Sequence, residues 1–148
     1  MRIDVQNNIL FLLDNDAEGQ DASRRLQGLD MPSNMRAMVL PDHEAFREFP
    51  VYGPQGVSIA DINRRAAAIE CYLDLELPSY GPAQVVWSNY KKDVDAWHGA
   101  LEHKESYAKH FFKRTDAEIA GEEYHTEKLE CVLDALIAEV TILASGKK

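Results

Sequence analysis

The chain has 148 residues, of which 45% are hydrophobic and 28% are charged, so its composition and length suit one globular domain with a modest core. A second full domain would not fit, and no run approaches the ~18 to 20 apolar residues of a membrane span. The formal net charge of −9 argues against a broad basic surface for DNA or RNA, so any contact with nucleic acid should be local, metal-assisted or supplied by a partner.

The first predicted element is a short strand that ends in an acidic turn. Residues 8–13 form an apolar run that stops at Asp14, as a strand buried on both faces does. After Gly19, apolar residues recur at helical spacing as far as Leu29, which predicts a short helix. A second apolar run over 35–40 should return as a parallel strand beside the first, because a helix connects the two. These elements predict an α/β fold.

The middle of the chain gives two expectations. Residues 41–58 are dense in proline and glycine, which predicts a loop excursion rather than a regular element. From Ala60 onward, apolar residues at helical spacing as far as Leu73 predict a helix that Asp61 caps or begins.

The last third combines a hairpin with a long helix. Residues 84–88 and 97–101 are typical of two short strands around a polar turn. Thr115 and Glu118 match a capping box, and the apolar stripe that follows predicts a helix over 116–145. This amphipathic helix should pack on its own domain or on a partner.

Cysteine and histidine carry little chemical signal. Cys71 and Cys131 each lie in an apolar helical pattern without a CxxC partner, which favours reduced thiols over a disulfide or a metal site. The five histidines lack the HExxH spacing of a zinc site. The N-terminus carries Asp4 and Asp14 instead of a basic segment followed by an apolar one, so we expect a cytoplasmic protein.

The most informative string runs from Leu13 to Gly19 and reads Leu-Asp-Asn-Asp-Ala-Glu-Gly. A buried strand that ends in two acids presents both carboxylates at one edge of a sheet. Asp14 and Asp16 would then offer the hard oxygen ligands that Mg²⁺ or Mn²⁺ prefers, while waters and substrate phosphates complete the coordination. The structural alternative is a helix-capping turn, where aspartate is favoured because it accepts from backbone N–H groups.

Two known families fit this string poorly. An EF-hand loop needs a bidentate Glu at its twelfth position, where this chain has Arg25. A haloacid-dehalogenase-like phosphatase also ends its first strand in Asp-x-Asp but continues with Thr or Val where this chain has Glu18. The phosphatase therefore stays a second alternative.

Residues 9–29 resemble the second motif of the Toprim domain, which consists of an apolar strand, Asp-x-Asp-x-x-Gly and a helix. Topoisomerases, primases and OLD-type nucleases share this domain. The resemblance extends to the HEPN/Toprim-associated proteins of bacteria and covers most of residues 8–113. Its further matches are Met35 to Pro41, Phe49-Pro50, Gly53-Pro54, the segment 60–70 and Trp87-Ser88-Asn89-Tyr90.

The resemblance implies a partial Toprim-like (Rossmann-like) parallel sheet over residues 1–114, with flanking helices, a loop insertion at 41–58 and a small hairpin. Residues 115–148 would add the C-terminal helix. A Toprim domain also places a Glu after an earlier strand, but only 13 residues precede Asp14 here. We therefore expect a truncated domain, a fragment or a half that needs a partner.

The resemblance also implies roles for further acids. Asp14 and Asp16 would bind the metal, Asp61 would be an additional ligand, and Glu70 would replace the missing proton-transfer group. For Asp61 the alternative is a helix cap, and for Glu70 it is a solvated or locally paired acid.

Basic residues on the predicted helix after residue 103 could face phosphates, although most such stripes are solvated faces. These residues are Lys104, Lys109, Lys113 and Arg114.

The function expected from the sequence is therefore Mg²⁺-dependent cleavage of nucleic-acid phosphodiester bonds by a Toprim-like domain or its remnant. The resemblance implies an origin in phage defence, and the domain could be inactive alone. The alternative from another class is a non-catalytic α/β binding or assembly module. We also expect self-association, or a partner protein that supplies the missing part.

Overall fold

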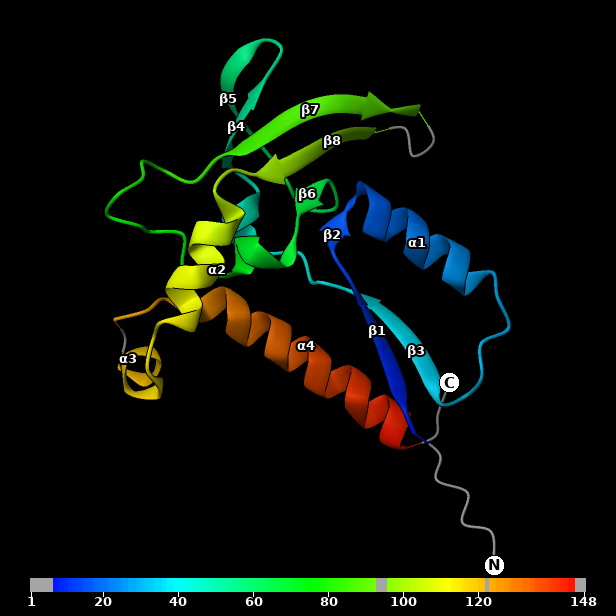
Figure 1. Cartoon of the computed structure of the whole chain (residues 1–148). Coiled ribbons are helices and arrows are strands. Elements are labelled where there is room, and N and C mark those ends of the chain that lie inside the picture. Colours follow the sequence, from blue (N-terminus) through cyan, green and yellow to red (C-terminus); the bar gives the residue numbers. More distant parts are fainter. Residues whose placement is uncertain (1–6, 93–95, 122, 146–148) are drawn as a thin grey trace, which may run out of the picture.

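The computed structural model describes residues 7–92, 96–121 and 123–145. Strands and helices mix along the chain, and the strands include parallel pairs with helices packed beside them, so the expected α/β class is confirmed (Figure 1). The strands form a parallel pair, a short antiparallel pair and a four-stranded mixed sheet.

The N-terminal unit is the predicted strand, helix and parallel strand. β1 (Ile9–Leu13) pairs in parallel with β3 (Met35–Val39) along its whole length. α1 (Ala17–Gln27) connects the two strands and packs against both. Leu29, the last residue of the predicted apolar stripe, lies beyond the end of the helix and is exposed. The unit therefore presents the carboxyl end of β1 next to the start of α1.

The predicted loop over residues 41–58 is wrong. This segment contains the short 3-10 helix η1 (Glu44–Phe46), β4 (Phe49–Gly53) and most of β5 (Gly56–Ala60), and β4 pairs antiparallel with β5. Only two residues separate the strands, and Gly56 has a φ of 94°, a conformation that favours glycine. The prolines and glycines mark a tight hairpin turn, not a long excursion.

The predicted helix after Ala60 is also wrong. The chain forms β6 (Ala66–Ala67) and the 3-10 helix η2 (Ile69–Tyr72) instead. Arg64 has a φ of 63°, in the left-handed region, so a right-handed helix cannot run through it. The apolar residues that suggested a helix are buried positions, such as Ile62, and tight turns place them in the core.

The predicted hairpin is confirmed. β7 (Val85–Lys91) and β8 (Ala96–Leu101) pair antiparallel, with a register shift between Trp87 and Asn89. β7 also pairs in parallel with β4, which completes a sheet in the order β5-β4-β7-β8. Residues 93–95 of the expected turn lie outside the described residues.

The C-terminal region contains two helices where one was predicted. Thr115 caps α3 (Asp116–Ala120) as expected, because its hydroxyl oxygen accepts from the backbone N–H of Glu118. Gly121 follows the end of α3, and α4 (Glu127–Ala144) begins six residues later. The single helix over 116–145 is therefore wrong, although its longer part exists as α4.

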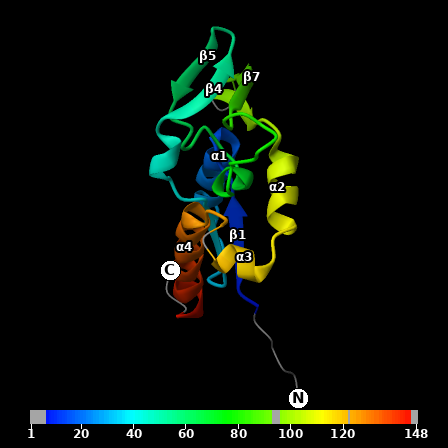
Figure 2. The same ribbon diagram turned by 90° about the vertical axis from the view of Figure 1, so that its left-hand side faces the viewer.

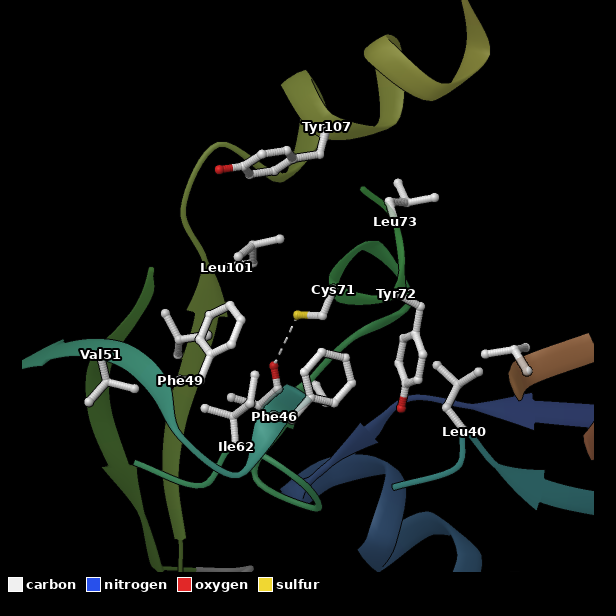
Figure 3. Packing of buried hydrophobic residues seen from close by; sticks show 14 residues of the cluster. Leu40, Phe46, Phe49, Val51, Ile62, Cys71, Tyr72, Leu73, Leu101 and Tyr107 are labelled. Carbon is white, nitrogen blue, oxygen red and sulfur yellow. Dashed lines mark hydrogen bonds between the residues drawn. The ribbon is translucent and has the colours of Figure 1, made fainter. Parts of the chain in front are cut away.

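The core lies between the four-stranded sheet, η1, η2, α4 and α2 (Lys104–Phe112) (Figure 3). Phe46 and Tyr72 meet edge to face, with ring centroids 4.9 Å apart. Cys71 is buried among them, and burial raises the pKa of its thiol to about 12. Both cysteines are free thiols, as predicted.

α4 lies beside the β1–β3 pair, on the side opposite α1 (Figures 1 and 2). Arg36 of β3 donates to Glu139 of α4 at 2.7 Å. Half of the apolar stripe of α4 faces inward, but Leu133, Ile137 and Val140 are exposed. Within the described part of the chain, no helix is long and apolar enough to cross a membrane.

The outer edge of β1 gives the first prediction. Among the described residues β1 pairs with β3 alone, and Phe11 and Leu12 on it are exposed. Since an open apolar edge recruits other strands, we expect concentration-dependent self-association, which Phe11→Lys should weaken. Sedimentation velocity over a range of concentrations measures self-association of the wild type and of Phe11→Lys. Leu29→Lys, at another exposed apolar residue, is the control. A wild-type monomer at every concentration would contradict the prediction.

Candidate functional site

The acidic turn at the end of β1 consists of Asp14, Asn15 and Asp16. β2 (Asn15–Asp16) pairs antiparallel with β6, which ties the turn to the chain around residues 64–67. Asn15 is fully buried, whereas Asp14 is exposed and Asp16 is partly exposed. Because side chains alternate along extended backbone, the inward position of Asn15 sends both neighbouring carboxylates outward.

Hydrogen bonds hold the buried amide of Asn15 in place. Its Nδ2 donates to Asp42 at 2.9 Å, and its Oδ1 accepts from Gln20 Nε2 at 3.0 Å and from the backbone N–H of Arg64 at 3.1 Å. One side chain thus connects the segment after β3, the helix α1 and the turn before β6. The expected motif treats this position as variable, so sequence reasoning missed it.

Each aspartate also has a structural contact. Asp16 is the N-cap of α1, and its Oδ1 accepts from the backbone N–H of Gly19 at 2.7 Å. Asp14 Oδ1 accepts from the backbone N–H of Ile69 at 3.0 Å. Each contact uses one carboxylate oxygen, and among the described residues the second oxygen of each side chain accepts no other hydrogen bond.

The contact with Ile69 brings Glu70 to the acidic turn. Partial burial raises the pKa of the Asp14 carboxyl, and the like charges of Asp16 and Glu70 raise it further. The Ile69 N–H and the nearby ammonium of Lys104 act in the opposite direction. Four of the residues singled out from the sequence, Asp14, Asp16, Glu70 and Lys104, therefore share one electrostatic site.

The other candidates lie in different surroundings. Asp61 closes a turn, since its Oδ1 accepts from the backbone N–H and the side-chain amide of Asn63, both at 2.9 Å. It does not cap a helix. Arg114 follows α2 and pairs with Glu118 at 2.9 Å. Lys109, in the second half of α2, and Lys113, just after its end, are both exposed, whereas Lys104 begins the helix.

A second cluster was not predicted. Single ligand atoms of Asp74, Glu76 and His125 all lie within 4.8 Å of one another, a spacing that could hold a metal ion. The Asp74 carboxylate is buried, and its two oxygens accept from the backbone N–H groups of Glu76 and His125, both at 3.0 Å. These bonds explain the cluster as an anchor for the segment before α4. No sequence pattern links residues so far apart.

The acidic turn fits an oxygen-coordinated divalent cation better than it fits zinc. Its donors are carboxylates, and hard oxygen ligands with retained waters suit Mg²⁺ and Mn²⁺. Burial is the main reason that the pKa of Asp14 is raised, and the charges of Asp16 and Glu70 raise it further, so a cation beside these carboxylates would offset an unfavourable charge. The donors of the acidic turn are thus of the chemical type that such a cation takes, whereas the group of three ligand atoms within 4.8 Å of one another in the described part of the chain is Asp74, Glu76 and His125.

No protein-family model, curated protein or solved structure matches the chain.

The buried amide gives a second prediction. Asn15→Ala removes the acceptor of the Arg64 N–H and the partner of Asp42, so unfolding free energy should fall by ~1 to 3 kcal/mol or more. Urea unfolding measures the change. Asn8→Ala, an exposed amide just before β1, is the control and should cost under ~0.5 kcal/mol. Equal stability of Asn15→Ala and wild type would show that the amide does not hold the turn.

Proposed function

We propose that the chain is a Toprim-like, metal-dependent module that cleaves nucleic-acid phosphodiester bonds in the cytoplasm, with phage defence as its setting. The observation that supports it most is the outward pair Asp14 and Asp16 at the carboxyl end of β1, with Glu70 and Lys104 beside them. Parallel strands commonly present their binding groups at this end. The resemblance of residues 9–29 to a Toprim motif adds support.

In this proposal each residue has one task. Asp14 and Asp16 hold Mg²⁺ or Mn²⁺ through carboxylate oxygens. When bound, the cation supplies charge neutralisation to the phosphate and polarises a phosphoryl oxygen. Lys104 adds a second positive charge beside Asp14, where it can pair with a phosphate oxygen.

Proton transfer is the weakest part of the site. Glu70 follows the residue that binds Asp14 and its charge acts on that carboxyl, so we assign Glu70 the role of general acid or base. A partner protein or a second copy of the chain would supply the group otherwise. We therefore propose that cleavage by the chain alone is slow.

The competing proposal is a non-catalytic α/β binding or assembly module. Two contacts favour it, because Asp16 caps α1 and Asp14 accepts from the backbone N–H of Ile69, and both bonds give the carboxylates a structural role. The two proposals differ in what the carboxylates do beyond these bonds, so a metal titration separates them.

The third prediction is that a divalent cation stabilises the fold through Asp14. Mn²⁺ at ~100 times its Kd should add ~2.7 kcal/mol, or roughly 5 to 10 °C in Tm, and Zn²⁺ should add less. Asp14→Asn should abolish this gain, while Asp21→Asn, one turn into α1, should keep it. Thermal unfolding with and without EDTA measures the gain. If manganese leaves the Tm of the wild type unchanged, the proposed metal site is wrong.

The pH dependence of unfolding of the metal-free protein provides a second test with Asp14→Asn. Asp14 has a raised pKa, so ionisation of this carboxyl disfavours the folded state. Its favourable contribution is complete below the ordinary aspartate pKa of ~3.9 and is lost as pH rises through the higher folded pKa. Asn keeps an acceptor for Ile69, so Asp14→Asn should gain stability over wild type as pH rises from ~3 to ~7. The capping alternative expects a loss.

The fourth prediction concerns activity. Nicking of plasmid or cleavage of RNA by the purified chain with Mg²⁺ should be weak, because a poorly placed acid–base group typically costs ~10² to 10⁴-fold in rate. Asp14→Ala should abolish the residual cleavage. Glu70→Gln should reduce it strongly if Glu70 transfers the proton, whereas Asp134→Asn on α4 should leave it unchanged. Cleavage that survives Asp14→Ala would overturn the proposed site.

A further inference from the structure

Both tryptophans of the chain line one cavity of about 290 Å³. The turn between β4 and β5 forms one wall, and Trp87 of β7, Trp97 of β8 and Arg65 form the others. None of these residues has a role in the function proposed above. Its volume is close to the ~300 Å³ lower end of ligand pockets, which suits a single ring system.

The sheet is built to hold Trp87 in this position. β7 lies between β4 and β8 (Figure 1). Both neighbouring strands carry a glycine beside the indole of Trp87. A Cβ at Gly53 would lie 3.2 Å from Cδ1 of Trp87, and a Cβ at Gly99 would overlap the six-membered ring. The indole therefore lies across two strands, and larger residues at either glycine would displace it.

Arg65 links this cavity to the acidic turn. Its guanidinium carbon lies 5.0 Å from the ring centroid of Trp87, and its Nη1 donates to the backbone carbonyl of Asp61 at 3.4 Å. Its backbone forms a β-bridge with Asp16. A ligand group in the cavity would thus be near the residues that we propose to bind the metal.

We propose that this cavity binds one unpaired base of a single-stranded nucleic acid, next to the phosphate that meets Asp14 and Asp16. The identity of the polymer rests on the proposed function, whereas the recognition of a flat ring rests on the cavity alone. Indole faces and a guanidinium plane both stack on bases, and the cation also attracts the attached phosphate.

The charge of the chain favours this mode of binding over others. A net charge of −9 cannot neutralise many phosphates, so affinity must come largely from stacking. A paired base is stacked inside its duplex and cannot enter a cavity of this size. The site therefore selects single strands, and its affinity falls little with added salt.

Tryptophan fluorescence tests the proposal directly, because every tryptophan of the chain lies at the cavity. Short oligo(dT) and oligo(rU) strands are titrated into the full chain in EDTA, with a duplex of equal length as the comparison. Saturable quenching by a single strand, DNA or RNA, together with a flat response to duplex, is the expected result. No quenching by either strand would overturn the proposal, as would equal quenching by oligoproline, a ligand of aromatic-lined peptide grooves.

Variants localise the binding. Trp97→Leu and Arg65→Gln should each weaken oligonucleotide affinity by roughly 5- to 100-fold. Tyr52→Leu removes an exposed aromatic ring from the opposite face of β4 and should change affinity less than ~2-fold. Arg65→Gln leaves both indoles in place, so it remains informative if Trp97→Leu does not fold. Affinity unchanged in Arg65→Gln would overturn the proposed cavity.

The two metal conditions separate this proposal from the proposed function. The wild type should bind the oligonucleotide in EDTA, because stacking does not use the metal. If oligonucleotides quench the fluorescence but manganese does not stabilise the wild type, the base-binding cavity is supported and only the proposed cleavage function is rejected. If manganese stabilises the wild type but oligonucleotides do not quench, the base-binding cavity is rejected.

Discussion

The geometry of the acidic turn depends on one fully buried amide, the side chain of Asn15. This amide forms hydrogen bonds with Asp42, with Gln20 and with the backbone of Arg64. The three residues belong to the segment after β3, to α1 and to the turn before β6. A buried amide without partners would cost free energy, so all three segments must meet around it. The outward position of Asp14 and Asp16 and the left-handed turn at Arg64 both follow from this constraint.

Local sequence signals predicted the N-terminal unit well, because a continuous apolar run and a helical stripe determine their own structure. Between residues 41 and 73 the same signals failed. Turns there carry apolar residues such as Ile62 into a core formed by distant segments, so their spacing resembles a helix that does not exist. The break between α3 and α4 after Gly121 was missed because the capping box at Thr115 and the apolar stripe from Leu129 onward both indicate helix, and they fit one continuous element.

In the candidate site, too, the sequence indicated individual residues but not the long-range contacts between them. Asp14 and Asp16 could be proposed from the motif, and Glu70 and Lys104 from the resemblance and the charge pattern. Their proximity could not be predicted, because it follows from the long-range contact of Asp14 with Ile69. Trp87 and the segment that holds Arg65 matched the resemblance but were given no role, because the register of β7 with β8 and the bridge of Arg65 to Asp16, which bring them together, are not visible in the sequence. An acidic chain that handles nucleic acid would need such features, since metal and stacking can replace a basic surface.

Anomalous diffraction from crystals soaked in Mn²⁺ would locate the divalent cation that we propose for Asp14 and Asp16. We expect an anomalous peak in contact with carboxylate oxygens of both aspartates, at roughly 2.0 to 2.3 Å. This peak should disappear in Asp14→Asn crystals. A peak at the cluster of Asp74, Glu76 and His125 with none at the acidic turn would show that the proposed site is wrong.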